Sequence, residues 1–380
     1  MKIGLIGFNQ TGKTSLFELL TGKNSIELAG GGKGASNVGT CFIPDERIDF
    51  LSDIFKPKKT TYAKIDITDV PGFAPSVDGN NSAAARFLND VRPCDAIIHV
   101  LRAFESDSVM HNSDSIDPAK DLEAIESEML FADLEMIEKR IGRINSSKKI
   151  TKENLAEIAL LERCFSHLEN GGAIRDMELS EEELLAVRGF SFLTEKPRLV
   201  VVNLDENQWA DNKSYPGKEA LISILSESDN DSKSTQDPSN SQLSILNSQL
   251  IELCVMMELE ISKLPIEDRQ LFIEDLGITE PGISVLAKAA YGIMNLISFL
   301  TYGSDEVRAW TIEDGTIAKV AAGKIHSDIE RGFIRAEVIK YSDIFELGSI
   351  AKVKDKGLFK LEGKEYVVSD GDLITFRFNV

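Results

Sequence analysis

Residues 1–20 read MKIGLIGFNQTGKTSLFELL, and this stretch decides the fold. Its first six residues form the short apolar run of a buried strand, and residues 15–20 have the spacing of an amphipathic helix. Between them, residues 7–14 match the pattern G-x-x-x-x-G-K-S/T in full. A strand, a glycine-bearing loop and a helix in this order direct backbone N–H groups and the positive end of the helix dipole toward a phosphate. The opening therefore predicts an α/β protein with a phosphate-binding loop.

The residues of this loop have separate expected roles. The glycines let backbone amides turn inward, Lys13 neutralises the charge of the β- and γ-phosphates, and the Thr14 hydroxyl holds Mg²⁺. We expect the nucleotide to be contacted by Gly7, Asn9, Gln10, Thr11, Gly12, Lys13, Thr14 and Ser15.

Further apolar strands alternate with helices as far as residue 105, and the pattern returns near residue 198. We expect strands over residues 63–68, 96–101 and 198–203. Apolar strands separated by helices form a doubly wound, mostly parallel sheet, with ligands at the carboxyl ends of the strands.

The pattern changes from Pro118 onward. Residues 121–144 and 152–169 are charge-rich, with apolar positions three and four apart, and Ser146-Ser147-Lys148-Lys149 separates them. This pattern predicts two antiparallel helices inserted as an arm. Residues 226–241 are polar and poor in apolar side chains, which indicates a surface loop.

A chain of 380 residues exceeds the usual size of one domain. Short alternating strands and glycine-rich turns set the C-terminal part apart from the rest. We expect a nucleotide-binding domain at residues 1–117 and 196–295, a helical arm at 118–195, and a small α+β domain at 296–380.

The charge is unevenly distributed. The net charge is −20, which argues against a general binder of polyanions, but residues 300–380 contain 12 Lys or Arg and 14 Asp or Glu, a net charge of only about −2. The basic residues that crowd one region there are Arg308, Lys319, Lys324, Arg331 and Arg335. They fit either a surface that meets RNA phosphates or an ordinary solvated surface.

Four cysteines, Cys41, Cys94, Cys164 and Cys254, lie far apart and lack the spacing of a metal site. We therefore expect reduced, buried thiols in a cytoplasmic protein. No apolar run approaches the roughly 18–20 residues of a membrane span. No leader with a basic stretch and a cleavage site is apparent, so we expect no membrane association.

Two short motifs follow predicted strands. Asp69-x-x-Gly72 provides a carboxylate for the Mg²⁺ shell and a glycine N–H for the γ-phosphate, although it also fits a plain tight turn. Asn203-Leu204-Asp205-Glu206 lies where guanine-specific proteins carry N-K-x-D. Leu204 replaces the lysine and Glu206 the aspartate, which argues against a preference for guanine. We expect Asn203, Leu204 and Glu206 to contact the nucleotide. A hydrophilic strand end is the alternative reading.

Eight further stretches are distinctive: PDERID (44–49), DAIIHVLR (95–102), ADLEMIEKR (132–140), VRAWT (307–311), AAGKIHSD (321–328), GFIRAEV (332–338), EGKEYVV (362–368) and FRFNV (376–380). In these stretches, and over nearly its whole length, the chain resembles the Obg-like ATPase family, called YchF in bacteria. The resemblance implies a P-loop NTPase domain of the TRAFAC class, an arm and a C-terminal TGS domain of β-grasp type. It also implies ATP binding, with Asn203 and Glu206 matching the family's N-x-x-E base motif, and association with ribosomes or ribosomal RNA through the TGS domain and the arm.

Departures from the family pattern cluster around the γ-phosphate. Only Asn37-Val38-Gly39 of the first switch segment remains, and Lys33 takes the place of the threonine that senses Mg²⁺. The family's phosphate loop reads G-x-P-N-V-G-K-S, so Gln10 replaces an asparagine that helps to bind potassium. Residues 76–82 alter the glycine-rich second switch. We therefore expect a divergent member that binds nucleotide and hydrolyses it weakly, and potassium activation is not expected.

The group that orients the attacking water is not obvious. Phe73 stands where many nucleotide switches carry a glutamine for this purpose, and a phenyl ring cannot do it. His111 matches a histidine suspected of this role in the family, and histidine can position or deprotonate water near neutral pH. An ordinary loop histidine is the alternative. His99 lies inside an apolar strand, and we expect it to be a core residue with its hydrogen bonds satisfied.

The sequence therefore predicts a cytoplasmic switch that binds ATP with Mg²⁺ held by Thr14 and Asp69, hydrolyses it slowly with Lys13 neutralising charge, and acts on or near ribosomes as a monomer. A true GTPase and a scaffold that binds nucleotide without hydrolysing it are the alternatives.

Overall fold

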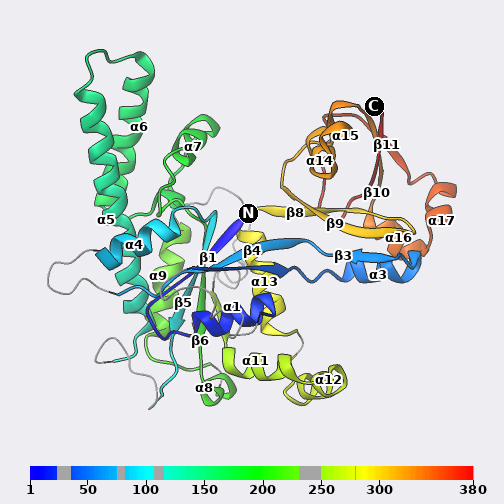
Figure 1. Cartoon of the computed structure of the whole chain (residues 1–380), viewed down its shortest axis with the longest axis horizontal. Coiled ribbons are helices and arrows are strands. Elements are labelled where there is room, and N and C mark those ends of the chain that lie inside the picture. The colour runs from blue at the N-terminus through cyan, green and yellow to red at the C-terminus, as the bar shows by residue number, and fades with distance from the viewer. Residues whose placement is uncertain are drawn as a thin grey trace. The chain divides into compact units, whose positions relative to one another are not determined.

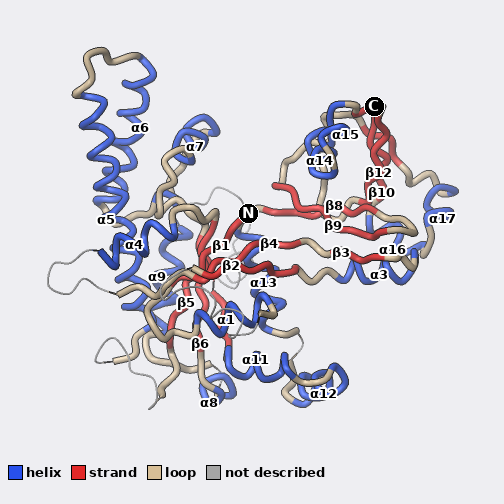
Figure 2. The backbone as a smooth tube through the Cα atoms, viewed as in Figure 1, coloured by secondary structure: helices blue, strands red, loops and turns tan. Residues whose placement is uncertain are grey.

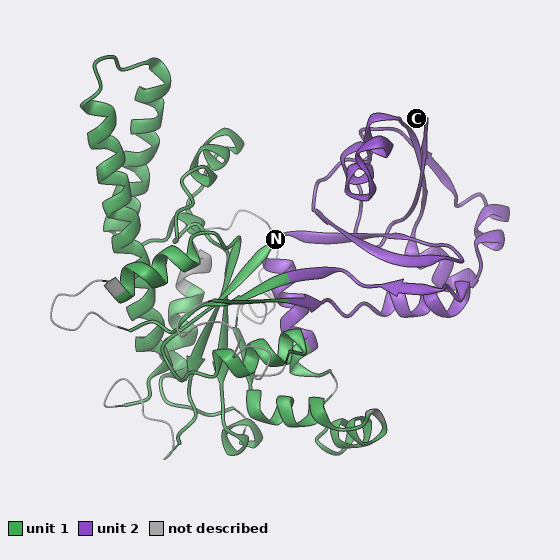
Figure 3. Cartoon of the chain, in the orientation of Figure 1, with its two compact units in different colours: residues 1–39, 66–283 green, residues 40–65, 284–380 purple. Residues whose placement is uncertain are grey.

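The computed structural model describes residues 1–23, 36–74, 82–106, 115–211, 213–230, 250–278 and 280–379 of the chain. These residues divide into two compact units, one formed by residues 1–39 and 66–283 and the other by residues 40–65 and 284–380 (Figure 3). Each unit has a sheet and a hydrophobic core, and each is described by itself.

The first unit is built on a mostly parallel sheet with the strand order β2-β4-β1-β5-β6-β7 (Figure 2). The strands are β1 (Lys2–Ile6), β2 (Asn37–Phe42), β4 (Lys64–Asp69), β5 (Ala96–Arg102), β6 (Arg198–Asn203) and β7 (Leu250–Leu253). All pairings from β4 to β7 are parallel. The expected doubly wound, mostly parallel sheet is confirmed. Because β1 is a central strand, the loop that follows it lies in the middle of the carboxyl edge.

Helices cover both faces of this sheet (Figure 1). Helices α4 (Ser82–Val91), α5 (Pro118–Asn145) and α9 (Lys218–Asn230) pack on one face, and α1 (Lys13–Thr21) and α11 (Val255–Lys263) lie together on the other. The shorter helices of the unit are η1 (Ile174–Asp176), α7 (Glu181–Arg188), α8 (Glu206–Ala210) and α12 (Ile266–Asp275). The inner strands β5 and β6 are wholly buried between the two layers, which explains their continuous apolar sequences.

The arm consists of α5 and α6 (Lys152–Glu169), which run side by side in Figure 1. Local sequence sets both starts. Asp117 caps α5 ahead of Pro118, and Thr151 forms a capping box with Asn154 at the start of α6. Apolar side chains of α5, α6 and α7 form a core of their own. The two predicted helices are confirmed, and the arm belongs to the first compact unit.

The predicted loop over residues 226–241 is partly wrong. Helix α9 continues to Asn230, because the apolar positions of residues 221–225 pack against α5 and carry the helix onward. Residues 231–241 lie outside the described part of the chain.

The second unit has a mixed sheet with the order β11-β10-β12-β8-β9-β3. Its elements are α3 (Glu46–Phe55), β3 (Lys59–Thr61), α13 (Gly282–Ile293), β8 (Leu296–Thr301), β9 (Glu306–Glu313), α14 (Ala318–Ile325), α15 (Ser327–Arg331), β10 (Phe333–Ile339), α16 (Tyr341–Leu347), α17 (Ile350–Asp355), β11 (Lys360–Glu362) and β12 (Leu373–Phe378). Helix α14 packs over a core that includes Phe299, Ile312 and Val338. This arrangement confirms the expected α+β domain.

The boundaries of this unit differ from the expected residues 296–380. Residues 40–65 also belong to it, since β3 pairs in parallel with β9 and Arg47 bonds Asp370 through Nη1 at 2.6 Å. A strand pairing across more than two hundred residues has no local sequence signal, so the boundary was not visible in the sequence.

All four cysteines are buried free thiols, as expected. Among the described residues, no helix is both long enough and apolar enough to span a membrane.

Candidate nucleotide site

The phosphate loop joins β1 to α1 at the carboxyl edge of the first sheet, and its glycines are required by geometry. Gly7 has φ +145°, and a Cβ there would lie 2.3 Å from the Val100 carbonyl oxygen. Gly12 has φ +94° and forms the N-terminal boundary of α1, where a Cβ would lie 2.3 Å from the Asn203 amide nitrogen. Both positions exclude other residues, so the loop keeps the close turn that a phosphate cradle needs.

Lys13 is folded back into the loop. Its side chain is buried, and Nζ donates to the backbone oxygens of Gly7, at 3.2 Å, and Phe8. Burial lowers the pKa of Lys13 to about 8, although the charge of Asp69 opposes this shift. A desolvated ammonium group bonded to neutral carbonyls is stabilised when an anion enters the loop.

Thr14 and Asp69 meet at the end of β4. The Thr14 hydroxyl donates to Asp69 Oδ2 at 3.0 Å. Burial raises the pKa of Asp69 above its ordinary value, despite the hydrogen bond from Thr14 and the charge of Lys13. One hydroxyl and one carboxylate side by side fit Mg²⁺, which takes few protein oxygens and completes its shell with water and phosphate. No larger group of metal-binding side chains occurs in the described parts of the chain.

Asn203 fixes the loop from the neighbouring side. Its Nδ2 donates to the Thr11 oxygen at 3.0 Å, and its Oδ1 accepts from the Val255 N–H at 3.1 Å. Leu204 N–H also donates to the Leu253 oxygen. The junction of β7 and α11 at Leu253 and Val255 was missed in the sequence, where only a short apolar run after a polar stretch marks it.

The other expected base-recognition residues are placed differently. The Leu204 side chain is 2 % exposed and packs in a cluster with Leu101, Val202 and Leu225, so this side chain does not face a ligand. Glu206 is exposed in the first turn of α8. Asp205 caps that helix by accepting from the Gln208 N–H at 2.8 Å, which fixes where Glu206 begins the helix.

The segment after β4 runs back against the phosphate loop. Phe73 N–H donates to the Gly7 oxygen at 2.9 Å, and Phe8 and Phe73 form an isolated parallel bridge. Asn9 contacts Gly72 at this crossing, a contact that the sequence did not reveal. The expected loop residues, Asp69, Gly72 and Asn203 are thus brought together, and Ser15 is half-buried in the first turn of α1.

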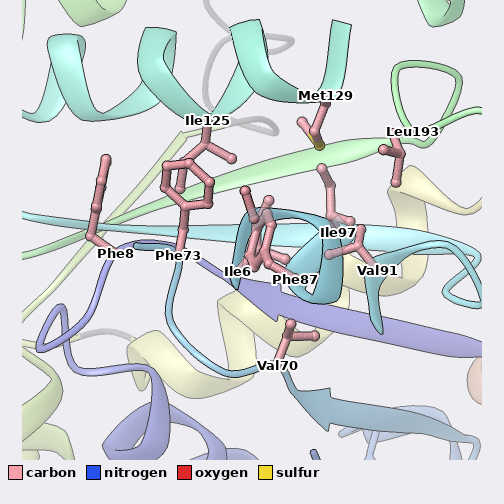
Figure 4. Close-up of a cluster of buried hydrophobic side chains, with 11 residues drawn as sticks. Ile6, Phe8, Val70, Phe73, Phe87, Val91, Ile97, Ile125, Met129 and Leu193 are labelled. Carbon is pink, nitrogen blue, oxygen red and sulfur yellow. The ribbon is translucent and has the colours of Figure 1, made fainter. Parts of the chain in front are cut away.

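Phe73 points into the hydrophobic core rather than toward the loop's ligand side (Figure 4). Its ring packs edge-on against Phe8 and Phe87, with centroids 5.4 and 5.2 Å away. Ile125 and Met129 of α5 belong to the same cluster. The phenyl ring therefore joins the segment after β4 to the base of the arm.

Several sequence predictions fall elsewhere. His111, Lys33 and residues 76–81 lie outside the described residues, as does the side chain of Ser82. The prediction that His99 has its hydrogen bonds satisfied is wrong. It is fully buried, and neither ring nitrogen has a hydrogen-bond partner within the described part of the chain. Burial lowers the pKa of His99 to about 3, so the ring is neutral at physiological pH.

The basic residues of the C-terminal region are divided between surfaces. Arg308 is half-buried, with its guanidinium 3.7 Å from the centroid of the Trp310 ring. Arg331 is paired with Asp328. Arg335 lies next to core-lining Ala336 on β10, so it points to the opposite face of that strand.

Comparison with known proteins agrees with this geometry. Residues 296–379 match the family YchF-GTPase_C, whose description is "Protein of unknown function (DUF933)". The "Ribosome-binding ATPase YchF" of Bacillus subtilis (strain 168) is 37% identical over 99% of this chain and 99% of its own length. The protein of the same name from Escherichia coli O157:H7 is 36% identical over 100% and 99%.

Among solved structures, the "Structure of the Schizosaccharomyces pombe YchF GTPase" superposes with a TM-score of 0.81 and 27% identity, covering 99% of this chain and 97% of that one. The full-length identity, the C-terminal match and the shared fold support one conclusion, which is that the chain belongs to the YchF family.

Proposed function

We propose that the protein is a nucleotide-dependent switch that binds ATP with Mg²⁺ and hydrolyses it slowly. The observation that supports this most strongly is the buried Lys13, which is bonded to neutral carbonyls inside a complete phosphate loop. Two relatives that match over their full length carry the name ribosome-binding ATPase.

Each residue of the site has a separate role that follows from its position. Backbone amides of residues 7–14 receive the phosphates, and Lys13 turns from its carbonyl partners to the β- and γ-phosphate oxygens. Thr14 and Asp69 hold the Mg²⁺, which when bound neutralises charge on the phosphates. Asn203 keeps Thr11 in place, and Gly72 offers its N–H beside the γ-phosphate. Catalysis by this set is electrostatic positioning, as phosphoryl transfer allows.

Equilibrium binding of labelled ATP and GTP with Mg²⁺ tests the proposal, with Lys13→Ala as the control. If ATP binds more tightly than GTP, the result supports recognition of adenine by the segment that begins at Asn203 and includes Glu206. A clear preference for GTP favours the GTPase alternative and contradicts that reading. Absence of binding in the wild-type protein contradicts the proposal as a whole.

We also propose that the protein acts in the cytoplasm as a monomer and associates with ribosomes through the arm and the C-terminal domain. The connection between α5 and α6 is exposed and basic, with Lys148, Lys149 and Lys152 around the 42 % exposed Ile150. A basic loop at the end of a long helix pair fits RNA phosphates. The buried free thiols fit a reducing compartment.

Co-sedimentation with ribosomes at increasing salt tests this partner. Replacing the three lysines of the arm connection by glutamate should reduce binding and flatten its salt dependence. A triple exchange of the exposed residues Lys352, Lys354 and Lys356 in the C-terminal unit separates the two surfaces. If neither variant changes binding, the proposed surfaces are wrong.

The second candidate function is a scaffold that binds nucleotide without hydrolysing it. The burial of Phe73 in the aromatic cluster supports this candidate, because the side chain next to Gly72 cannot orient water. A turnover assay with Lys13→Ala as the background decides between them. Phosphate release above that background supports an enzyme, and equal rates support the scaffold.

A further inference from the structure

The described residues that directly follow β4 offer no polar side chain. Residues 70–74 are Val, Pro, Gly, Phe and Ala, and Phe73 is 2 % exposed within the cluster drawn in Figure 4. Among the described residues, a group that orients an attacking water beside the γ-phosphate has to come from another part of the site.

Asn9 places such a group at this point. The residue is exposed in the phosphate loop, and its Oδ1 lies 2.1 Å from the position that a Cβ on Gly72 would occupy. The Asn9 carboxamide thus lies directly against the Gly72 backbone. Gly72 is the residue whose N–H is expected beside the γ-phosphate.

The backbone fixes this contact. The hydrogen bond from Phe73 N–H to the Gly7 oxygen and the bridge between Phe8 and Phe73 hold the two loops in register next to it. The Phe8 and Phe73 rings also pack edge-on against each other, which adds a side-chain contact between the two loops. A side chain held by two packed loops is suited to positioning a small molecule.

The chemistry of the side chain fits the task. A carboxamide has one acceptor and two donors, so it can accept from a water molecule and donate to a phosphate oxygen at once. The family pattern G-x-P-N-V-G-K-S has proline at this position, and a proline side chain has neither group. Asn9 therefore gives this chain a polar side chain that the family pattern lacks, near Phe73, whose own side chain cannot bond a water molecule.

We propose that the Asn9 carboxamide positions the attacking water in ATP hydrolysis, an inference that rests on the proposed function. The water oxygen forms a bond to the γ-phosphorus as the bond to the ADP oxygen breaks. The water's proton passes to the released phosphate, so the products are ADP and inorganic phosphate. Asn9 holds the water in line and neither gains nor loses a proton.

The variant Asn9→Ala tests this inference, with Asn145→Ala at the exposed end of α5 as a matched control. We expect kcat of Asn9→Ala to fall about tenfold, the rate equivalent of one hydrogen bond made in the transition state. The affinity for a non-hydrolysable ATP analogue should fall by less than kcat does, and the melting temperature should stay unchanged. Asn145→Ala should match the wild type in all three measurements.

A binding measurement separates positioning from a structural role. ADP with aluminium fluoride mimics the transferring phosphoryl group with its in-line water, and Asn9→Ala should bind it about tenfold more weakly. ADP alone should bind equally well to both proteins. Loss of ADP affinity would mean that Asn9 only shapes the loop, which overturns the inference.

The remaining outcomes distinguish this inference from the proposed function. If kcat is unchanged in Asn9→Ala and turnover is lost in His111→Ala, the histidine and not Asn9 positions the water. This result would overturn the inference but not the proposed function. If the wild-type protein binds no nucleotide, or turns over no faster than Lys13→Ala, the proposed enzyme fails and the inference fails with it.

Discussion

The first unit buries several positive charges, and the base of the arm and the phosphate loop give theirs different partners. At the base of the arm, Glu126 receives Arg175 at 2.6 Å and Arg198 at 3.0 Å. Burial opposes ionisation there, but the two guanidinium groups hold the pKa of Glu126 well below its usual range. In the phosphate loop, Lys13 bonds only neutral carbonyls among the described residues, and burial lowers its pKa to about 8.

The difference separates a structural charge from a binding charge. The arm base has its anion built in, so its ion pairs are complete in the folded protein. The phosphate loop keeps a cation whose burial is unfavourable until an anion arrives. Burial and carbonyl partners by themselves do not mark a site, because buried Lys196 also donates to the backbone oxygens of Arg92 and Cys94. The phosphate loop around Lys13 is what distinguishes it.

Removing the built-in anion should have the largest effect. Glu126→Gln leaves two guanidinium groups without their carboxylate, and we expect the free energy of unfolding in urea to fall by about 3 kcal/mol. This is the lower end of the usual cost, because the Glu126 side chain keeps 18% exposure. The control is Glu135→Gln, which breaks a surface pair with Lys139 and should change stability by less than about 0.5 kcal/mol. Equal effects of the two variants would contradict the comparison.

Removing the cation of the phosphate loop should not destabilise the nucleotide-free protein, in contrast to removing Glu126. Lys13→Met keeps most of the buried stem and removes the charge, so we expect no loss of unfolding free energy at pH 7. ATP affinity should fall roughly 10- to 100-fold, the equivalent of one charge-assisted hydrogen bond of about 1.5–3 kcal/mol. Calorimetric titration and urea unfolding measure both quantities. A variant that is less stable and still binds ATP normally would show that Lys13 is a structural residue.

The lowered pKa of Lys13 predicts a pH dependence of its own. Below about pH 8 the lysine is protonated in folded and unfolded protein, and its burial cost is fully present. Between pH 8 and its ordinary pKa of 10.5 the folded protein binds fewer protons, so this group makes stability rise with pH. ATP requires the charged form, so its affinity should fall by up to about tenfold for each pH unit above 8. Lys13→Met should lack this slope, and a wild-type affinity that is flat to pH 10 would refute the prediction.

The smallest effect is expected from the carboxylate beside the loop. The charge of Asp69 opposes the fall in the pKa of Lys13, so Asp69→Asn should move the midpoint of the pH dependence down by less than about one unit. The measurement uses ADP without added Mg²⁺, so that loss of the metal ligand does not interfere. A midpoint that moves upward would contradict the assigned role of Asp69.

Much of the site could be predicted because its residues are close in sequence. Residues 7–14 bend within one loop, and their glycines, lysine and threonine each have a local reason to be there. Asp69 and Asn203 were also found, because each ends a strand that has an apolar signature. Parallel strands bring such ends to one edge of a sheet.

Other parts of the site gave no such signal. Leu204 was expected at the base, but an apolar residue after a buried strand can point into the core, and here it does. Val255 and Leu253 complete the clamp on Asn203 from a strand that was not recognised. The imidazole of His99 has no polar neighbour within bonding distance among the described residues, which strand periodicity cannot reveal.

The sequence by itself determined the phosphate loop, the parallel sheet and the two arm helices, because contiguous glycines, caps and apolar periodicity specify them locally. Only the tertiary structure decided that Asn203 holds Thr11, that Asn9 lies on Gly72, and that β3 joins the sheet of the second unit. These contacts join residues dozens to hundreds of positions apart. Their partners are chosen by strand order and register, which depend on the packing of the whole unit rather than on the residues that meet.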